Sequence, residues 1–114
     1  MAIRPVDLFT VVPSPEEERF DTLLSGKGPW RLERIVSAGQ SSPRSFWYDQ
    51  DEDEWVTLLS GRATLLFADD DGSTESVDLL PGQALLIPAH RRHRVTSTSA
   101  EPPCLWLALH GKST

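Results

Sequence analysis

The sequence predicts an all-β fold, either a barrel or a two-sheet sandwich, preceded by one short helix. Seven glycines and nine prolines separate many short runs rich in Val, Ile, Leu, Trp and Thr, a pattern typical of strands joined by tight turns. These runs follow one another too closely for the helical crossovers of parallel βαβ units. A chain of 114 residues can bury a core without disulfides, so we expect a single domain over residues 1–114.

The helix is predicted near the N-terminus. Ser14 is followed by Pro15 and, three positions after the serine, by Glu17, the arrangement of a capping box with proline in the first turn. Apolar side chains then follow at helical spacing, before a glycine that can end the helix: Phe20, Leu23, Leu24 and Gly26. We expect a helix over about residues 15–24, packed on the surface of the sheet.

Eight strand candidates follow the predicted helix. Turn sequences such as Ser60-Gly61 and Pro81-Gly82 separate them, and these residues favour the backbone conformations that tight turns require. In chain order the candidates are 30–36, 45–49, 54–60, 62–68, 74–79, 83–87, 93–98 and 104–110. Eight strands in this interval, about residues 30–110, suit a barrel or a jelly roll.

Two spacings in this region carry a family resemblance. Glu54 is followed by six residues and Gly61, and Gly82 is followed by five residues and Pro88, with His93 five positions further on. The spacing resembles the two motifs of the cupins, G-x5-H-x-H-x3/4-E-x6-G and G-x5-P-x-G-x2-H-x3-N. The segments FWYDQ, EWV, IPAH and HRV also resemble a group of small single-domain bacterial cupins in the RmlC-like superfamily. This resemblance implies a cupin-type jelly-roll β-barrel.

The resemblance also implies a metal site inside the barrel. Glu54 and His93 stand at the motif positions of the family's glutamate and of its last histidine, while Tyr48 and Gln50 replace the two histidines of the first motif. The implied ligands are Glu54, His93 and Gln50, and the implied ion is Mn, Fe, Ni or Zn. Tyr48 and His93 are the candidate catalytic residues. Strand alternation agrees, because it puts Glu54 on the same side as Val56 and Leu58.

Other residues are possible further ligands or lining residues of the pocket. Asp49 would replace Gln50 if the strand register differed by one residue, and His90 stands in the turn before His93. His110 ends an alternating run, but the sequence does not tell which of its two faces meets the cavity. Arg91, Arg92 and Arg94 at the expected mouth could steer a carboxylate or phosphate substrate, or could be ordinary exposed charges on a turn.

Two functional hypotheses remain open on the sequence alone. The first is a metal-dependent protein that binds a small polar or anionic molecule, with the metal as Lewis acid or redox centre. The second is a metal-free binding or sensing module that uses the same polar groups. A third and weaker one is a metal-free isomerase with His93 as base and Tyr48 as acid. The sequence does not decide whether the protein is an enzyme.

Composition limits the partners and the compartment. The formal net charge of −6 argues against nucleic acid, whose binding needs basic surfaces. Asp7, Thr10 and Pro13 interrupt the first apolar stretch, which argues against a signal peptide or membrane span. A lone Cys104 fits a reducing compartment, so we expect a cytoplasmic protein. We also expect a homodimer, with the segment 30–36 as its seam, an expectation that rests as much on the resemblance as on the residues.

Overall fold

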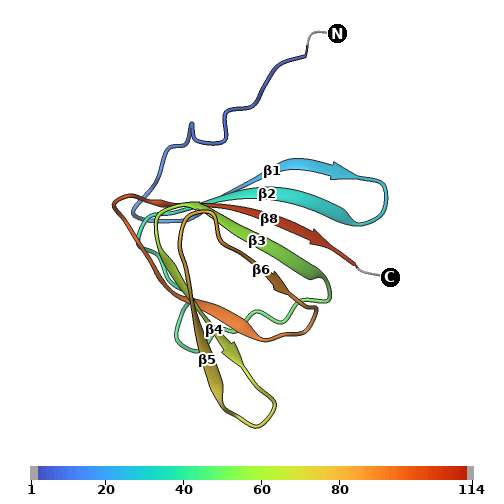
Figure 1. Ribbon diagram of the computed structural model, residues 1–114, viewed down its shortest axis with the longest axis vertical. Coiled ribbons are helices and arrows are strands. Elements are labelled where there is room, and N and C mark those ends of the chain that lie inside the picture. The colour runs from blue at the N-terminus through green and yellow to red at the C-terminus, as the bar shows by residue number, and fades with distance from the viewer. Residues whose placement is uncertain (1–2, 113–114) are drawn as a thin grey trace.

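Two antiparallel sheets make up the fold (Figure 1). The computed structural model describes residues 3–112. Its strands are β1 (Arg19–Gly26), β2 (Trp30–Ser37), β3 (Asp53–Ser60), β4 (Ala63–Ala68), β5 (Thr74–Leu79), β6 (Ala84–Ile87), β7 (His93–Thr98) and β8 (Cys104–Gly111). The larger sheet has the order β1-β2-β8-β3-β6, and the smaller one has the order β5-β4-β7. The predicted all-β jelly roll is therefore confirmed.

The core lies between the two sheets, and the alternation of buried residues along the strands is clearest on β4. On β4, Ala63, Leu65 and Phe67 are buried while the residues between them are half-buried, as expected for a strand with one face against the core. The larger sheet contributes its own alternating set, and the buried cluster contains Val56, Leu58, Ala63, Leu65, Phe67, Leu79, Ile87, Cys104, Trp106 and Ala108. The polar inward positions come at one end of this core, where a cavity opens.

The predicted helix over 15–24 is wrong. Residues 15–17 form a bend, and β1 then runs from Arg19 to Gly26 and pairs antiparallel with β2. The chain returns through a turn at Gly28, whose φ of 75° is in the left-handed region that glycine adopts readily. Pairing with β2 gives β1 a ladder of inter-strand hydrogen bonds along one edge, with one register shift between Thr22 and Leu24, and this ladder outweighs the local capping signal. The sheets therefore begin before residue 30.

The predicted strand at 45–49 is also wrong. Only Tyr48 pairs there, through an isolated bridge to His93. The preceding residues turn instead, because Phe46 donates its backbone N–H to the carbonyl of Pro43. The other seven strand predictions are confirmed, with ends that differ by no more than one residue.

The segment before β1 is extended and leads away from the two sheets (Figure 1). Ile3, Val6, Phe9 and Val12 on this segment are all strongly exposed. Within residues 3–112, no helix is long and apolar enough to cross a membrane.

Candidate functional site

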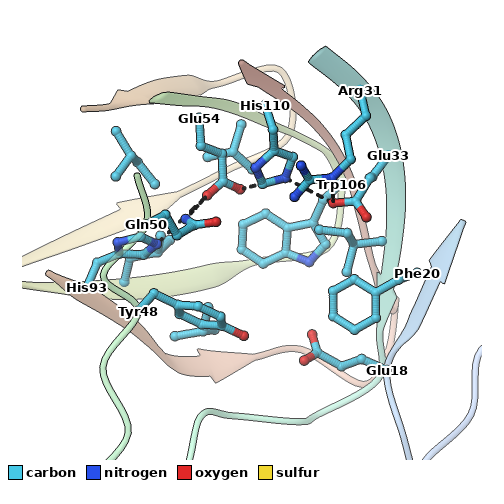
Figure 2. Close-up of a pocket in the computed structure, with 15 residues that line it drawn as sticks. Glu18, Phe20, Arg31, Glu33, Tyr48, Gln50, Glu54, His93, Trp106 and His110 are labelled. Atoms are coloured by element: carbon cyan, nitrogen blue, oxygen red, sulfur yellow. Dashed lines mark hydrogen bonds and ion pairs between the residues drawn. The ribbon is translucent and has the colours of Figure 1, made fainter. Parts of the chain in front are cut away.

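A cavity of about 330 Å³ opens between the sheets, at the end of the core (Figure 2). Its size suits a small molecule. The apolar part of its wall consists of Phe20, Ile35, Val56, Leu65, Ile87, Val95 and Trp106. The polar part consists of Glu18, Arg31, Glu33, Tyr48, Gln50, Glu54, His93 and His110. Charged and titratable groups are thus concentrated at one end of an otherwise apolar interior.

Glu54 and His110 are brought together by the register of the larger sheet. They stand directly opposite each other on β3 and β8, so their side chains leave the same face only a few ångströms apart. His110 Nε2 lies 3.9 Å from Glu54 Oε2, and both side chains are nearly buried. The sequence left the face of His110 open, and the register assigns it to the cavity.

His93 reaches the same carboxylate from the smaller sheet. Its Nε2 lies 3.8 Å from Glu54 Oε1, the other oxygen of that group. His93 Nδ1 lies 2.8 Å from the carbonyl oxygen of Arg91, which fixes the ring and directs Nε2 into the cavity. One buried carboxylate therefore has an imidazole nitrogen near each oxygen, at distances too long for direct hydrogen bonds.

Gln50 and Tyr48 complete this cluster from the irregular segment between β2 and β3. The Gln50 side-chain amide donates to Glu54 Oε1 at 3.1 Å, and the Gln50 carbonyl accepts from the backbone N–H of His90. Tyr48 exchanges two backbone hydrogen bonds with His93, and the two rings stack with centroids 5.3 Å apart. The four residues taken from the sequence, Tyr48, Gln50, Glu54 and His93, therefore surround one cavity.

Arg31 and Glu33 also line the cavity, although the sequence analysis did not select them. They alternate with Ile35 on the inward face of β2. Glu33 Oε1 lies 2.9 Å from His110 Nε2, yet neither ring nitrogen of His110 has a properly aligned hydrogen-bond partner among residues 3–112. The contact therefore joins a carboxylate oxygen and an imidazole nitrogen without the alignment of a hydrogen bond. Arg31 pairs with Glu52 at 2.8 Å and approaches Glu33 at 3.8 Å.

Glu18 lies at the other end of the cavity, directly before β1. The hydroxyl of Ser37 donates to Glu18, and the indole N–H of Trp106 donates to the oxygen of Ser37 at 3.1 Å. Figure 2 shows Glu18, Phe20 and Tyr48 around the lower part of the cavity, with the Trp106 indole above Glu18 and Tyr48 at the centre of the view. Glu18 was not among the predicted site residues, because a helix over 15–24 gives no reason to place it in a barrel.

The environment of Tyr48 keeps its phenol protonated. Burial raises the pKa of Tyr48 above its ordinary value, and the negative charges of Glu18 and Glu54 raise it further. A neutral hydroxyl can both donate and accept a hydrogen bond. Tyr48 therefore presents a polar, uncharged group to the middle of the cavity.

Comparison with known proteins places this fold in a family. The family model described as "Cupin domain" matches residues 32–110, more than half of the chain. The chain belongs to the cupin family. No curated protein matches it.

Solved structures agree with this assignment. A Ralstonia eutropha JMP134 protein, named provisionally as a mannose-6-phosphate isomerase, is 41% identical, with a TM-score of 0.87 over 97% of this chain and 100% of that one. A cupin superfamily protein from Desulfitobacterium hafniense DCB-2 is 18% identical, with a TM-score of 0.77 over 99% and 94% of the two chains. Oxalate decarboxylase of Bacillus subtilis, which has Mn(II) centres, is 16% identical, with a TM-score of 0.65 over 85% of this chain and 25% of that chain.

Two candidates from the sequence lie outside the cupin cavity. His90 Nδ1 contacts Asp49 Oδ1 at 2.8 Å, and both side chains are more than half exposed. His90 has a φ of 65°, a left-handed conformation that explains why the cupin motif has glycine at this position. The Asp49–His90 pair is therefore a surface contact beside the turn.

The arginines near this turn are also directed away from the cavity. Arg91 pairs with Asp69 at 2.8 Å and lies over the ring of Phe67. Arg92 and Arg94 lie over the ring of Trp47. None of the three arginines lines the cavity, and their steering of an anion toward it stays a prediction.

The donors of the cavity fit a divalent cation in their chemistry. Imidazole nitrogens with carboxylate and amide oxygens suit Mn, Fe, Ni or Zn better than a soft ion, and His110 is a buried side chain without an aligned partner. Two ligands of a tetrahedral zinc ion lie about 3.4 Å apart, whereas the two imidazoles stand 3.8 and 3.9 Å from Glu54. Among residues 3–112 no three His, Cys, Asp or Glu side chains lie so that together they could hold a metal ion, so these side chains would have to move closer together for an ion to bind.

Proposed function

We propose that this cupin binds a divalent cation through Glu54, His93 and His110 and holds a small polar molecule beside it. The observation that carries the proposal is one buried carboxylate with an imidazole Nε2 at 3.8 Å from one oxygen and another at 3.9 Å from the second. A buried carboxylate needs a cation or several donors, and Gln50 supplies the only hydrogen bond to Glu54 from a described side chain. When bound, the ion would polarise the molecule as a Lewis acid.

The chain's own residues have separate roles in this proposal. The carbonyl of Arg91 orients His93, and Gln50 orients Glu54 or supplies its amide oxygen as a further ligand. Tyr48, stacked on His93, holds a proton on its hydroxyl that it can donate to the bound molecule. The apolar wall formed by Val56, Ile87 and their neighbours excludes water from the cluster.

The charged side chains that line the cavity affect which net charge a bound molecule can carry. Glu18, Glu33 and Glu54 line it with Arg31 as the one guanidinium, and Arg31 is already paired with Glu52. A phosphorylated sugar would bring two further negative charges into this surrounding. At the Glu18 end, away from the proposed ion, the carboxylate favours a ligand group that is neutral or cationic over an anionic one, so a sugar phosphate, as in the name of the Ralstonia relative, is not part of this proposal.

A metal-free binding module is the second candidate. It is favoured by the hydrogen bond from Gln50 to Glu54 and by the separations of 3.8 and 3.9 Å between the two imidazoles and Glu54, which exceed the separation of two ligands of one tetrahedral ion. In this case Glu54, His93 and Tyr48 would hydrogen-bond the small molecule directly.

Metal loading separates the two candidates. Protein prepared without a histidine tag is dialysed against Mn(II), Fe(II), Ni(II) or Zn(II) in turn, and the bound metal is measured per chain. We expect one ion per wild-type chain and an affinity at least about tenfold lower for Glu54→Gln and His110→Asn. The control His90→Asn removes the exposed histidine and should bind as the wild type does. No metal in the wild type, or equal binding by Glu54→Gln, would favour the metal-free module.

A further inference from the structure

Among the described carboxylates that line the cavity, Glu18 has no basic side chain beside it. Glu33 has His110 and Arg31 beside it, and Glu54 has the two imidazoles. Glu18 receives a hydrogen bond from the neutral hydroxyl of Ser37, but no described Lys, Arg or His lies within ion-pair distance of it. This end of the cavity therefore carries a negative charge that no basic side chain of residues 3–112 pairs with.

Aromatic rings surround the same end. Phe20, Tyr48 and Trp106 line the cavity together with Glu18, and Figure 2 shows the Glu18 carboxylate directed toward the space between the rings of Tyr48 and Phe20. The Tyr48 hydroxyl has no hydrogen-bond partner among residues 3–112, and the Trp106 indole N–H is already used by Ser37. The rings of Phe20 and Trp106, the part of the Tyr48 ring that does not stack on His93 and one free hydroxyl thus line the space that a ligand would enter.

We propose that this end of the cavity, formed by Glu18, Phe20, Tyr48 and Trp106, binds the ammonium group of a small organic cation. A carboxylate among aromatic faces is the surrounding that alkylated ammonium groups prefer, because the ring quadrupoles and the negative charge act together. The inference rests on the proposed function, since it assigns the ligand class of the same cavity.

The other end of the cavity supplies the second anchor for such a molecule. The buried His110 has no aligned hydrogen-bond partner, and His93 directs its Nε2 into the cavity. A hydroxyl or other polar group at the far end of the molecule would contact this cluster, either directly or beside the proposed ion. The ligand class is therefore a short amine or quaternary ammonium compound with a polar group at its other end.

The test compares two probes of the same shape. Choline and its uncharged isostere 3,3-dimethylbutan-1-ol are titrated into the protein by calorimetry, with tryptophan fluorescence as a second readout. We expect choline to bind the wild type about tenfold more tightly than the alcohol. In Glu18→Gln this preference should fall to less than about twofold, because the counter-charge is lost.

Glu17→Gln is the matched control. It removes the same charge from the preceding residue of the chain, which is exposed and outside the cavity, and it should keep the preference for choline. Equal affinity for both probes in the wild type, binding of neither probe, or an unchanged preference in Glu18→Gln would overturn the ammonium site.

The two proposals fail separately. Glu18 is not among the proposed metal ligands, so Glu18→Gln should load metal as the wild type does. Loss of the choline preference with metal loading intact is the expected result for this variant. A wild type that prefers choline but takes up no metal would overturn the metal site and keep the ammonium site.

Discussion

Tyr48 is the only tyrosine of the chain, which makes its ionisation directly measurable by the ultraviolet absorbance of the phenolate. Burial, followed by the charges of Glu18 and Glu54, raises its pKa. We therefore expect a titration midpoint above the ordinary value of about 10. In Glu18→Gln the midpoint should move back toward that value, and a midpoint equal to that of a model peptide would contradict the placement of Tyr48 in the cavity.

The raised pKa of Tyr48 makes the folded protein less stable as the pH rises into the alkaline range. Since the folded protein holds the Tyr48 proton more tightly than the unfolded chain, the unfolded chain loses this proton first as the pH rises. The contribution of Tyr48 is complete below a pH of about 10 and is lost as the pH rises through the raised pKa. Comparison with Tyr48→Phe, which has no phenol to ionise, isolates this contribution in denaturant unfolding.

Part of the cavity follows from single residues of the sequence. Glu54 and His93 were identified from motif spacing, and the alternation of β3 explains why Glu54 points inward with Val56. Arg31 and Glu33 alternate with Ile35 in the same way, and charges at inward positions of a strand were a usable signal. Glu18 could not be found by periodicity, because its place depends on how the chain enters β1.

At the scale of the elements, the turn between β3 and β4 depends on Gly61. Its φ is 84°, and an added Cβ would lie 2.8 Å from the Cα of Cys104 and from the carbonyl oxygen of Pro103. Both contacts are to backbone atoms, which cannot turn aside as the end of a flexible side chain can. Gly61 therefore satisfies a conformational and a steric requirement at once.

At Gly72, in the turn between β4 and β5, only the conformational requirement applies. Its φ is 86°, but nothing lies within 4 Å of an added Cβ. We expect Gly72→Ala to cost about 1–2 kcal/mol for the left-handed conformation alone. Gly61→Ala should cost about 1–3 kcal/mol more because of the overlap. Equal losses in denaturant unfolding with unchanged m-values would contradict the steric argument.

The two errors in the predicted elements have a common physical cause. Phe20 and Leu24 have the spacing of one face of a helix, but both are more than half exposed on β1. Their helical spacing therefore does not indicate a buried helix face. The conformation of residues 19–26 is decided by their pairing with the edge of β2. A pattern of neighbouring residues does not report such a tertiary contact. At 45–49 the apolar residues suggested a strand, although only Tyr48 finds a partner in the sheet.

At the scale of the whole molecule, an apolar row crosses the outer face of the larger sheet. The register aligns one residue from each of its five strands, namely Leu24, Leu32, Leu109, Trp55 and Leu86. Leu24, Leu109, Trp55 and Leu86 are between 42% and 65% exposed. A row of this kind on the open face of a sheet is unusual for a monomer.

We expect two copies of the chain to cover this row. The seam first expected at 30–36 cannot form by edge pairing, since β2 is bonded on both sides to β1 and β8, but its outward Leu32 belongs to the row. Light scattering after gel filtration should give a dimer for the wild type and a monomer for Leu86→Lys. Leu80→Lys, at an exposed leucine outside the row, is the control. A monomeric wild type, or a dimer that survives Leu86→Lys, would contradict this interface.

The buried thiol of Cys104 can be used to detect ligand binding without an added label. The Cys104 side chain is fully inaccessible, and its thiol donates to the carbonyl oxygen of Arg62 at 3.0 Å. A thiol reagent can therefore modify it only when the start of β8 separates from the turn at Gly61, so the rate of modification measures the frequency of that opening. A molecule that binds the protein more tightly before the start of β8 separates than after it must slow the modification of the thiol. Slower labelling of this one sulfur would identify ligands from a chemical collection before any reaction of the protein is known.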